Sequence, residues 1–178
     1  MSKLQDYLAT NPPLRKTVVG YLIRDDKVLL GVRTRVSDGL GHLIVAGIGG
    51  GLEEGESPKD ALRREILEEI EVHVTDFQRV GNIVCLSPHH PSWNLIVTYY
   101  LVSGFEGEPK KTEDIDPCWY SKRELPLRDM WPDNRITVPL VLDGKRIAGS
   151  FLYDGDGQII EQDLRQLAPG EPFSEIVA

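Results

Sequence analysis

The apolar residues of this chain gather mainly in short runs, a pattern typical of buried β-strands. Val18 to Ile23 and Val28 to Leu30 are two such runs, and the four charged residues between them predict the turn of a hairpin. We expect further strands over 79–86, 95–102 and 117–120, and a last hairpin formed by 147–153 and 158–164.

Two segments carry helix signals instead. Ser57 is a favourable N-cap and Pro58 suits the first helical position, so the sequence predicts a helix from about Pro58 to Ile70. A second helix is expected around Pro132 to Leu142, although Pro139 weakens its continuity. Strands mixed with helices in this order predict one α+β domain, in which helices lie on the faces of a mixed sheet.

The segments outside these elements divide the chain. Residues 1–16 include Pro12 and Pro13 and show little periodicity, so we interpret them as an N-terminal extension. We expect the domain to cover 17–168 and a C-terminal tail to cover 169–178. Glycines at positions 39, 41, 47, 49, 50, 51 and 55 mark a long loop ahead of the first predicted helix.

The net charge argues against some partners. Lysine and arginine number 20 against 28 aspartate and glutamate residues, which gives a formal net charge of −8. Such a chain repels phosphate backbones, so we expect no long nucleic acid as a partner. A phosphate-bearing ligand must instead be held locally, by a metal ion or by a few placed cations.

Cellular location is indicated by what the sequence lacks. No apolar run approaches the ~20 residues that cross a bilayer, and residues 1–11 lack the order of a signal peptide. Cys85 and Cys118 provide neither a disulfide framework nor a metal-type spacing. We therefore expect a cytoplasmic protein with no membrane partner, whose oligomeric state the sequence does not indicate.

Three glutamates share one face of the first predicted helix. Because residues three and four apart lie on the same side of a helix, the carboxylates of Glu65, Glu68 and Glu69 come within reach of one another. Like charges at this spacing repel, so the cluster is either solvated or compensated by a cation. Oxygen ligands in this number suit Mg²⁺ or Mn²⁺. The apolar residues expected to pack on the sheet are Leu62, Ile66, Leu67 and Ile70.

The flanking residues favour the metal over a solvated face. The stretch reads Gly50-x5-Glu56-x7-Arg64-Glu65-Ile66-x-Glu68-Glu69-x-x-Val72, which resembles the signature of the Nudix hydrolases. It departs from the signature at Glu71, where the family has a glycine, and this leaves the geometry of the helix exit open. The resemblance implies the Nudix fold, a mixed β-sheet sandwiched between α-helices, and a Mg²⁺-dependent hydrolysis.

The resemblance also implies roles for the acids. In this family the helix carboxylates bind the divalent ions, and one glutamate or a nearby loop acid helps to activate water. We accordingly assign Glu65, Glu68 and Glu69 to the metal and keep Glu65 and Glu68 both open as the base. Asp114 matches an acid that completes the metal site from a loop, although an ordinary surface charge is an alternative for it.

The glycine-rich loop is expected to serve the phosphates. Loop glycines at a helix N-terminus let backbone groups approach an anion closely, which makes Gly50 and Gly51 candidates for the phosphate site. A carbonyl near Gly49 or Gly50 is a candidate metal ligand. Arg64, counted among the catalytic residues, is expected to form an ion pair with Glu56 that holds the loop against the helix.

The C-terminal half resembles one branch of the family, which hydrolyses oxidised purine nucleoside triphosphates such as 8-oxo-dGTP. The matching segments are Pro-Cys-Trp at 117–119, Leu-Pro-Leu at 125–127, Asp-Met-Trp-Pro-Asp at 129–133 and Gly-x-Phe at 149–151. The resemblance implies that Trp131 contacts the purine and that Asp133 hydrogen-bonds its edge.

Further base contacts are expected from Pro132, Asn134, Ala46 and Ile48. Three positions depart from the branch, because Asn134 replaces an acid, Ala46 an asparagine and Val18 a threonine. These changes alter the polarity of the pocket and leave the substrate within the branch open.

Two groups of charged or titratable residues remain. Arg33 aligns with a lysine of the branch and is a candidate phosphate contact, with an ordinary surface charge as an equal alternative. His89 and His90 lie beside prolines and are interpreted as loop residues.

The favoured function is therefore Mg²⁺-dependent hydrolysis of a modified purine nucleoside triphosphate to a monophosphate and pyrophosphate. Another nucleotide substrate, such as a nucleotide sugar, a dinucleoside polyphosphate or a capped RNA end, would keep the same mechanism. A non-catalytic module that only binds a nucleotide is the alternative from another class, but such modules are expected to lose the acids that are present here.

Overall fold

The computed structural model describes residues 2–33 and 44–173, so Gly39 and Gly41 of the glycine-rich loop lie outside the described residues. This part of the chain forms helices α1 (Lys3–Leu8), α2 (Pro58–Ile70) and α3 (Pro132–Leu142), with 3-10 turns η1 (Pro91–Trp93) and η2 (Leu127–Asp129). The strands are β1 (Arg15–Arg24), β2 (Lys27–Arg33), β3 (Ile44–Ala46), β4 (His73–Leu86), β5 (Leu95–Glu106), β6 (Ile115–Ser121), β7 (Ile147–Tyr153) and β8 (Ile159–Gln166).

The described strands form one eight-stranded mixed sheet. Its order is β3-β2-β1-β5-β4-β7-β8, and β6 pairs with β2 outside this path. β1 runs parallel to β5 and β4 runs parallel to β7, whereas the other pairs are antiparallel. The predicted hairpins β1–β2 and β7–β8 are confirmed.

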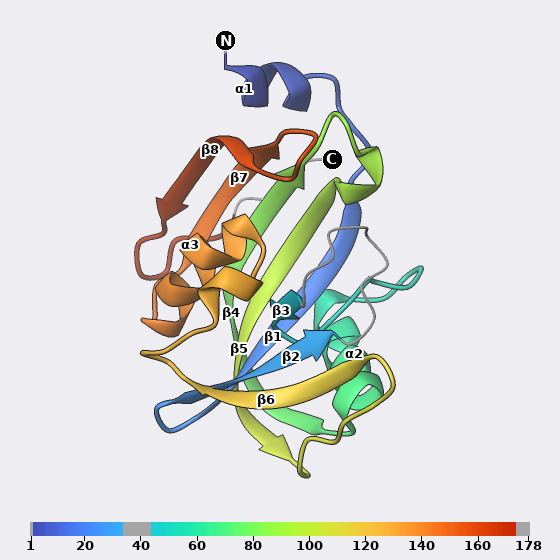
Figure 1. Ribbon diagram of the computed structural model, residues 1–178, viewed down its shortest axis with the longest axis vertical. Coiled ribbons are helices and arrows are strands. Elements are labelled where there is room, and N and C mark those ends of the chain that lie inside the picture. Colours follow the sequence, from blue (N-terminus) through green and yellow to red (C-terminus); the bar gives the residue numbers. More distant parts are fainter. Residues whose placement is uncertain (1, 34–43, 174–178) are drawn as a thin grey trace.

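Helices cover both faces of the sheet, as predicted, with α3 on one face and α2 on the other (Figure 1). Alternating side chains of β1 serve the two layers, because successive residues of a strand point to opposite faces. Tyr21 belongs to the cluster that includes Val138 and Val141 of α3. Val18 and Leu22 belong to the cluster under α2.

Helix α2 has the predicted bounds, but one of its residues that we expected to be buried is exposed. The Ser57 side chain caps its first turn, and Leu62, Ile66 and Ile70 form the buried stripe four residues apart. The expectation that Leu67 packs on the sheet was wrong. Leu67 follows Ile66 directly, so its side chain points about 100° around the helix from the buried stripe, and the residue is 39% exposed.

The exit of α2 is left-handed although it carries no glycine. Glu71 has φ 57° and ψ 37°, and its amide donates to the Leu67 carbonyl. Glu71 thus adopts the left-handed backbone conformation that a glycine would adopt with less strain.

Helix α1 lies within the segment interpreted as an N-terminal extension, and the sequence pattern did not predict it. The amides of Lys3 and Leu4 donate to the two carboxylate oxygens of Glu161 in β8, at 3.1 and 2.8 Å. Leu4 is buried against Val84, Leu86 and Leu152. A helix of this length is marginal in isolation, so these distant contacts hold it. Of the helices described, none is both long enough and apolar enough to cross a membrane.

Candidate active site

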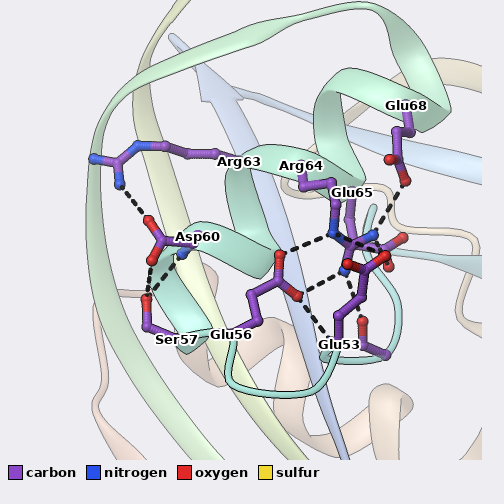
Figure 2. Close-up of polar contacts among 9 residues, drawn as sticks. Glu53, Glu56, Ser57, Asp60, Arg63, Arg64, Glu65 and Glu68 are labelled. Atoms are coloured by element: carbon purple, nitrogen blue, oxygen red, sulfur yellow. Dashed lines mark hydrogen bonds and ion pairs between the residues drawn. The ribbon is translucent and has the colours of Figure 1, made fainter.

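Arg64 on α2 ties the glycine-rich loop to the acidic face of the helix (Figure 2). Its Nε and Nη2 atoms each donate to Glu56 at 2.8 Å, which is a bidentate pair. Nη2 also donates to the Gly51 carbonyl at 2.9 Å. Nη1 donates to Glu65 at 2.9 Å and to Glu68 at 3.1 Å. The expected Arg64–Glu56 ion pair is present, and the same guanidinium also compensates two glutamates of the cluster.

The pair sets the charge state of the loop acid. Hydrogen bonds from the Arg64 side chain and the Glu53 amide lower the pKa of Glu56 to about 2. Glu56 therefore stays ionised across the physiological range, which keeps the arginine anchored and the loop in place.

Gly50 lies directly against the Glu65 carboxylate. A Cβ built on Gly50 would lie 2.5 Å from Glu65 Oε2, so the position admits only a glycine without displacing the acid. The Gly50 carbonyl accepts from the Val18 amide at 2.9 Å. Of the two carbonyls considered as metal ligands, that of Gly49 is the one we retain.

Glu69 is largely buried, as Glu65 is, whereas Glu68 is exposed. Its Oε2 accepts from the Gly49 amide at 3.1 Å, and its Oε1 lies 3.6 Å from Arg33 Nη2. Burial raises the pKa of Glu69 to about 7, although Arg33 and the Gly49 amide act in the opposite direction. Arg33, expected at the phosphates, therefore lies beside a cluster carboxylate.

Glu68 and Asp114 lie on the outer side of the cluster. The Glu68 side chain is 60% exposed. A second cavity, of about 700 Å³, is lined by Arg33, Glu68, Glu69 and Asp114 together with Thr112, Glu113 and Ile115. The structure thus brings the predicted loop acid, Asp114, to the same cavity as two helix glutamates.

The donor set fits a hard divalent cation, although the carboxylates are not gathered into a coordination shell. Within residues 2–33 and 44–173, no three acid, histidine or cysteine side chains converge as metal ligands. The ligand oxygens are instead held by Arg64, Arg33 and the Gly49 amide. Glu65, Glu68 and Glu69 could hold Mg²⁺ or Mn²⁺, because carboxylate oxygens are the ligands that these ions prefer and Gly50, with no side chain, leaves space beside Glu65.

A cavity of about 670 Å³ extends from the cluster to the expected base pocket. Glu65, Glu69, Gly49, Gly50, Gly51 and Arg33 line it at the acidic end, and Ala46, Trp131, Asp133 and Asn134 line it as well. Its floor is the α3 side of the sheet, formed by Val19, Tyr21, Val97, Tyr99 and Cys85.

Asp133 is buried in an uncharged polar environment. It is 6% exposed, with the Tyr99 hydroxyl 3.5 Å and the Cys85 thiol 4.0 Å from its Oδ2. Burial raises the pKa of Asp133 above its ordinary value, while hydrogen bonds from Tyr153 and Tyr99 act against the rise. The Tyr99 hydroxyl also donates to Asn134 Oδ1 at 3.1 Å.

Two expected base contacts do not line this cavity. Ile48 is fully buried in the cluster under α2. It pairs with Gly20, and a Cβ built on Gly20 would meet side chains of α2, so this face of the pair lies under the helix. Pro132 forms the first turn of α3 and is likewise absent from the cavity wall. Val18, by contrast, does line the cavity.

Sequence reasoning missed the polar floor residues Tyr99, Cys85 and Tyr153, and the rim residue Trp93. Alternation in β5 indicates that Val97 and Tyr99 share a face, but which face they occupy depends on the pairing with β1. His89 and His90 lie in the loop between β4 and η1, as expected.

The chain matches the NUDIX domain over residues 13–141. It is 30% identical to the oxidized purine nucleoside triphosphate hydrolase of Mus musculus over 146 residues, which cover 82% of this chain and 91% of that protein. It is 29% identical to the NAD-capped RNA hydrolase NudC of Pseudomonas fluorescens over 119 residues, or 67% of this chain and 41% of that protein. The crystal structure of the MutT protein from Bacillus halodurans has the same fold, with a TM-score of 0.72 at 22% identity over 85% of this chain and 97% of that one.

Proposed function

The chain belongs to the Nudix family of hydrolases, and from that premise we propose that it hydrolyses a modified purine nucleoside triphosphate to a monophosphate and pyrophosphate. The observation that carries the proposal is the continuity of one cavity. The same 670 Å³ space is lined by Glu65 and Glu69 of the acidic helix and by Trp131 and Asp133 of the expected base pocket. A nucleotide likewise joins a charged phosphate chain to an aromatic base, so one molecule can occupy both ends of this cavity.

The acidic end is assigned to the phosphates. Glu65, Glu68 and Glu69 would hold Mg²⁺, which when bound neutralises phosphate oxygens and lowers the pKa of its water. Arg64 keeps Glu65 in place and anchors the loop through Glu56 and Gly51. Of the two base candidates, Glu65 is favoured, because it lines the cavity whereas Glu68 lies outside it.

The other end is assigned to the purine. Trp131 offers an aromatic surface, and Asp133 and Asn134 offer hydrogen-bonding groups. Because burial raises its pKa, the Asp133 carboxyl retains a proton to higher pH than an exposed aspartate and can then donate to the base as well as accept from it. The similarity to the mouse enzyme supports an oxidised purine as the base.

A substrate panel tests the proposal directly. The panel contains dGTP, 8-oxo-dGTP, 2-oxo-dATP, methylated purine triphosphates, dCTP, ADP-ribose and NAD-capped RNA, each with Mg²⁺ and with EDTA. We expect the highest kcat/KM for a modified purine triphosphate, release of pyrophosphate rather than phosphate, and no turnover in EDTA. Preference for ADP-ribose or capped RNA would reassign the substrate, and turnover in metal-free protein would refute the metal role.

A further inference from the structure

An aromatic cluster lies at the rim of the main cavity, and two of its three rings, those of Trp93 and His90, have no role in the proposed function. Trp93, the last residue of η1, lines this cavity together with Trp131. The centroids of the two indole rings lie 5.6 Å apart, and the ring planes meet edge to face at an angle of 71°. The His90 ring packs on the Trp93 ring, with 4.2 Å between the ring centroids and 31° between the ring planes. The rim thus presents two tryptophan rings set almost at right angles.

Neighbouring loops hold this cluster in place. His90 Nε2 pairs with the Gly155 carbonyl at 2.9 Å. At Gly157, which has φ 75°, a Cβ would lie 3.5 Å from Trp131 and 3.7 Å from Trp93. The turn between β7 and β8 therefore packs closely against both tryptophans.

Asn94, the residue after Trp93, anchors the loop through its hydrogen bonds. Only 2% of it is exposed, and its Oδ1 accepts from the Ser87 amide at 2.8 Å. Its Nδ2 donates to the Tyr7 hydroxyl at 3.1 Å, and its carbonyl accepts from the Arg15 amide at 3.0 Å. Trp93 is therefore followed directly by a buried residue that is hydrogen-bonded to Ser87, Tyr7 and Arg15.

Core packing does not account for Trp93. Three buried apolar clusters form the core of the described part of the chain, and Trp93 belongs to none of them. Half-buried aromatic rings that line a cavity and are held rigidly are typical of ligand sites, because they offer a large contact area at little cost in side-chain entropy.

We propose that Trp93 is a specificity-determining residue, which forms with Trp131 a two-walled aromatic corner that selects purine over pyrimidine nucleotides. A planar base can stack on one of two perpendicular rings and meet the other with its edge. The two fused rings of a purine extend far enough to contact both walls, whereas a single pyrimidine ring engages one. This inference rests on the proposed nucleotide substrate and extends its recognition to a residue outside the family signature.

The experiment measures binding without catalysis. Dissociation constants for dGMP, 8-oxo-dGMP and dCMP are determined by calorimetry in EDTA for the wild type, Trp93→Leu, Trp93→Phe and Trp131→Leu. Leucine keeps an apolar side chain at the rim, and phenylalanine restores an aromatic ring. Trp119→Phe is the matched control, because Trp119 stacks on Phe105 away from this cavity. Thermal melts establish that each variant is folded.

We expect Trp93→Leu to weaken purine monophosphate binding roughly 5- to 30-fold and dCMP binding much less, since loss of one aromatic–base contact is worth about 1–2 kcal/mol. Trp93→Phe should recover most of the affinity, and Trp119→Phe should match the wild type. If Trp93→Leu binds purines like the wild type while Trp131→Leu does not, the role of Trp93 is refuted and the proposed function stands. If the wild type binds these nucleotides but hydrolyses no triphosphate, the proposed function fails while the corner remains.

Discussion

Replacing Gly50 by alanine tests whether the position of the Glu65 carboxylate limits catalysis. The added Cβ would lie 2.5 Å from Glu65 Oε2, so the carboxylate must retreat by about 0.9 Å to reach an ordinary contact of 3.4 Å. The atom that must move is the end of a flexible side chain, so we expect the free energy of unfolding to change little. A misplacement of about 1 Å in a catalytic group costs roughly 100-fold in rate, so kcat should fall by about that factor.

The neighbouring glycine provides the control. A Cβ on Gly51 would meet nothing within 4 Å, so Gly51→Ala leaves the Glu65 carboxylate in place and should lower kcat far less than Gly50→Ala, although Gly51 lines the same cavity. Both variants are assayed by pyrophosphate release over a range of Mg²⁺ concentrations, with urea denaturation in parallel. Wild-type kcat in Gly50→Ala would contradict the proposed effect on Glu65, and so would an equal loss of activity in a folded Gly51→Ala variant.

Three further substitutions test other parts of the structure. Glu68→Gln removes a proposed ligand from an exposed position, so most turnover should be lost with almost no change in melting temperature; near-normal kcat at saturating Mg²⁺ would contradict the assignment. Asp133 has a folded-state pKa above its unfolded value, so the folded state binds the extra proton and wild-type stability falls as pH rises from about 4 towards that pKa. Asp133→Asn should therefore gain stability relative to the wild type across this window in urea titrations, and a constant difference at all pH values would refute the argument. Glu71→Gly removes the strain of a left-handed glutamate and should stabilise the fold by about 1 kcal/mol in the same assay, whereas a loss would show that the exposed contact with Lys110 matters more.

The sequence specified local structure well because its signals there are local. The Ser57 cap and the apolar spacing of α2 lie within one segment, and the helix has the predicted bounds. Placement of side chains around the cavity depends instead on long-range pairing. Ile48 was expected at the base, but its pairing with Gly20 puts it under α2. Tyr99 reaches Asp133 only because β5 lies between β1 and β4.

The docking of α1 on β8 has a consequence for the order in which the chain folds. The Leu4 amide bonds to Glu161, 157 residues later, so α1 lacks its anchor until β8 has been synthesised. Contacts that close such long loops form late, since their entropic cost is recovered only when the intervening structure is in place. The N-terminal helix should therefore be the last element to dock during synthesis, and its amides the last to gain protection from hydrogen exchange on refolding.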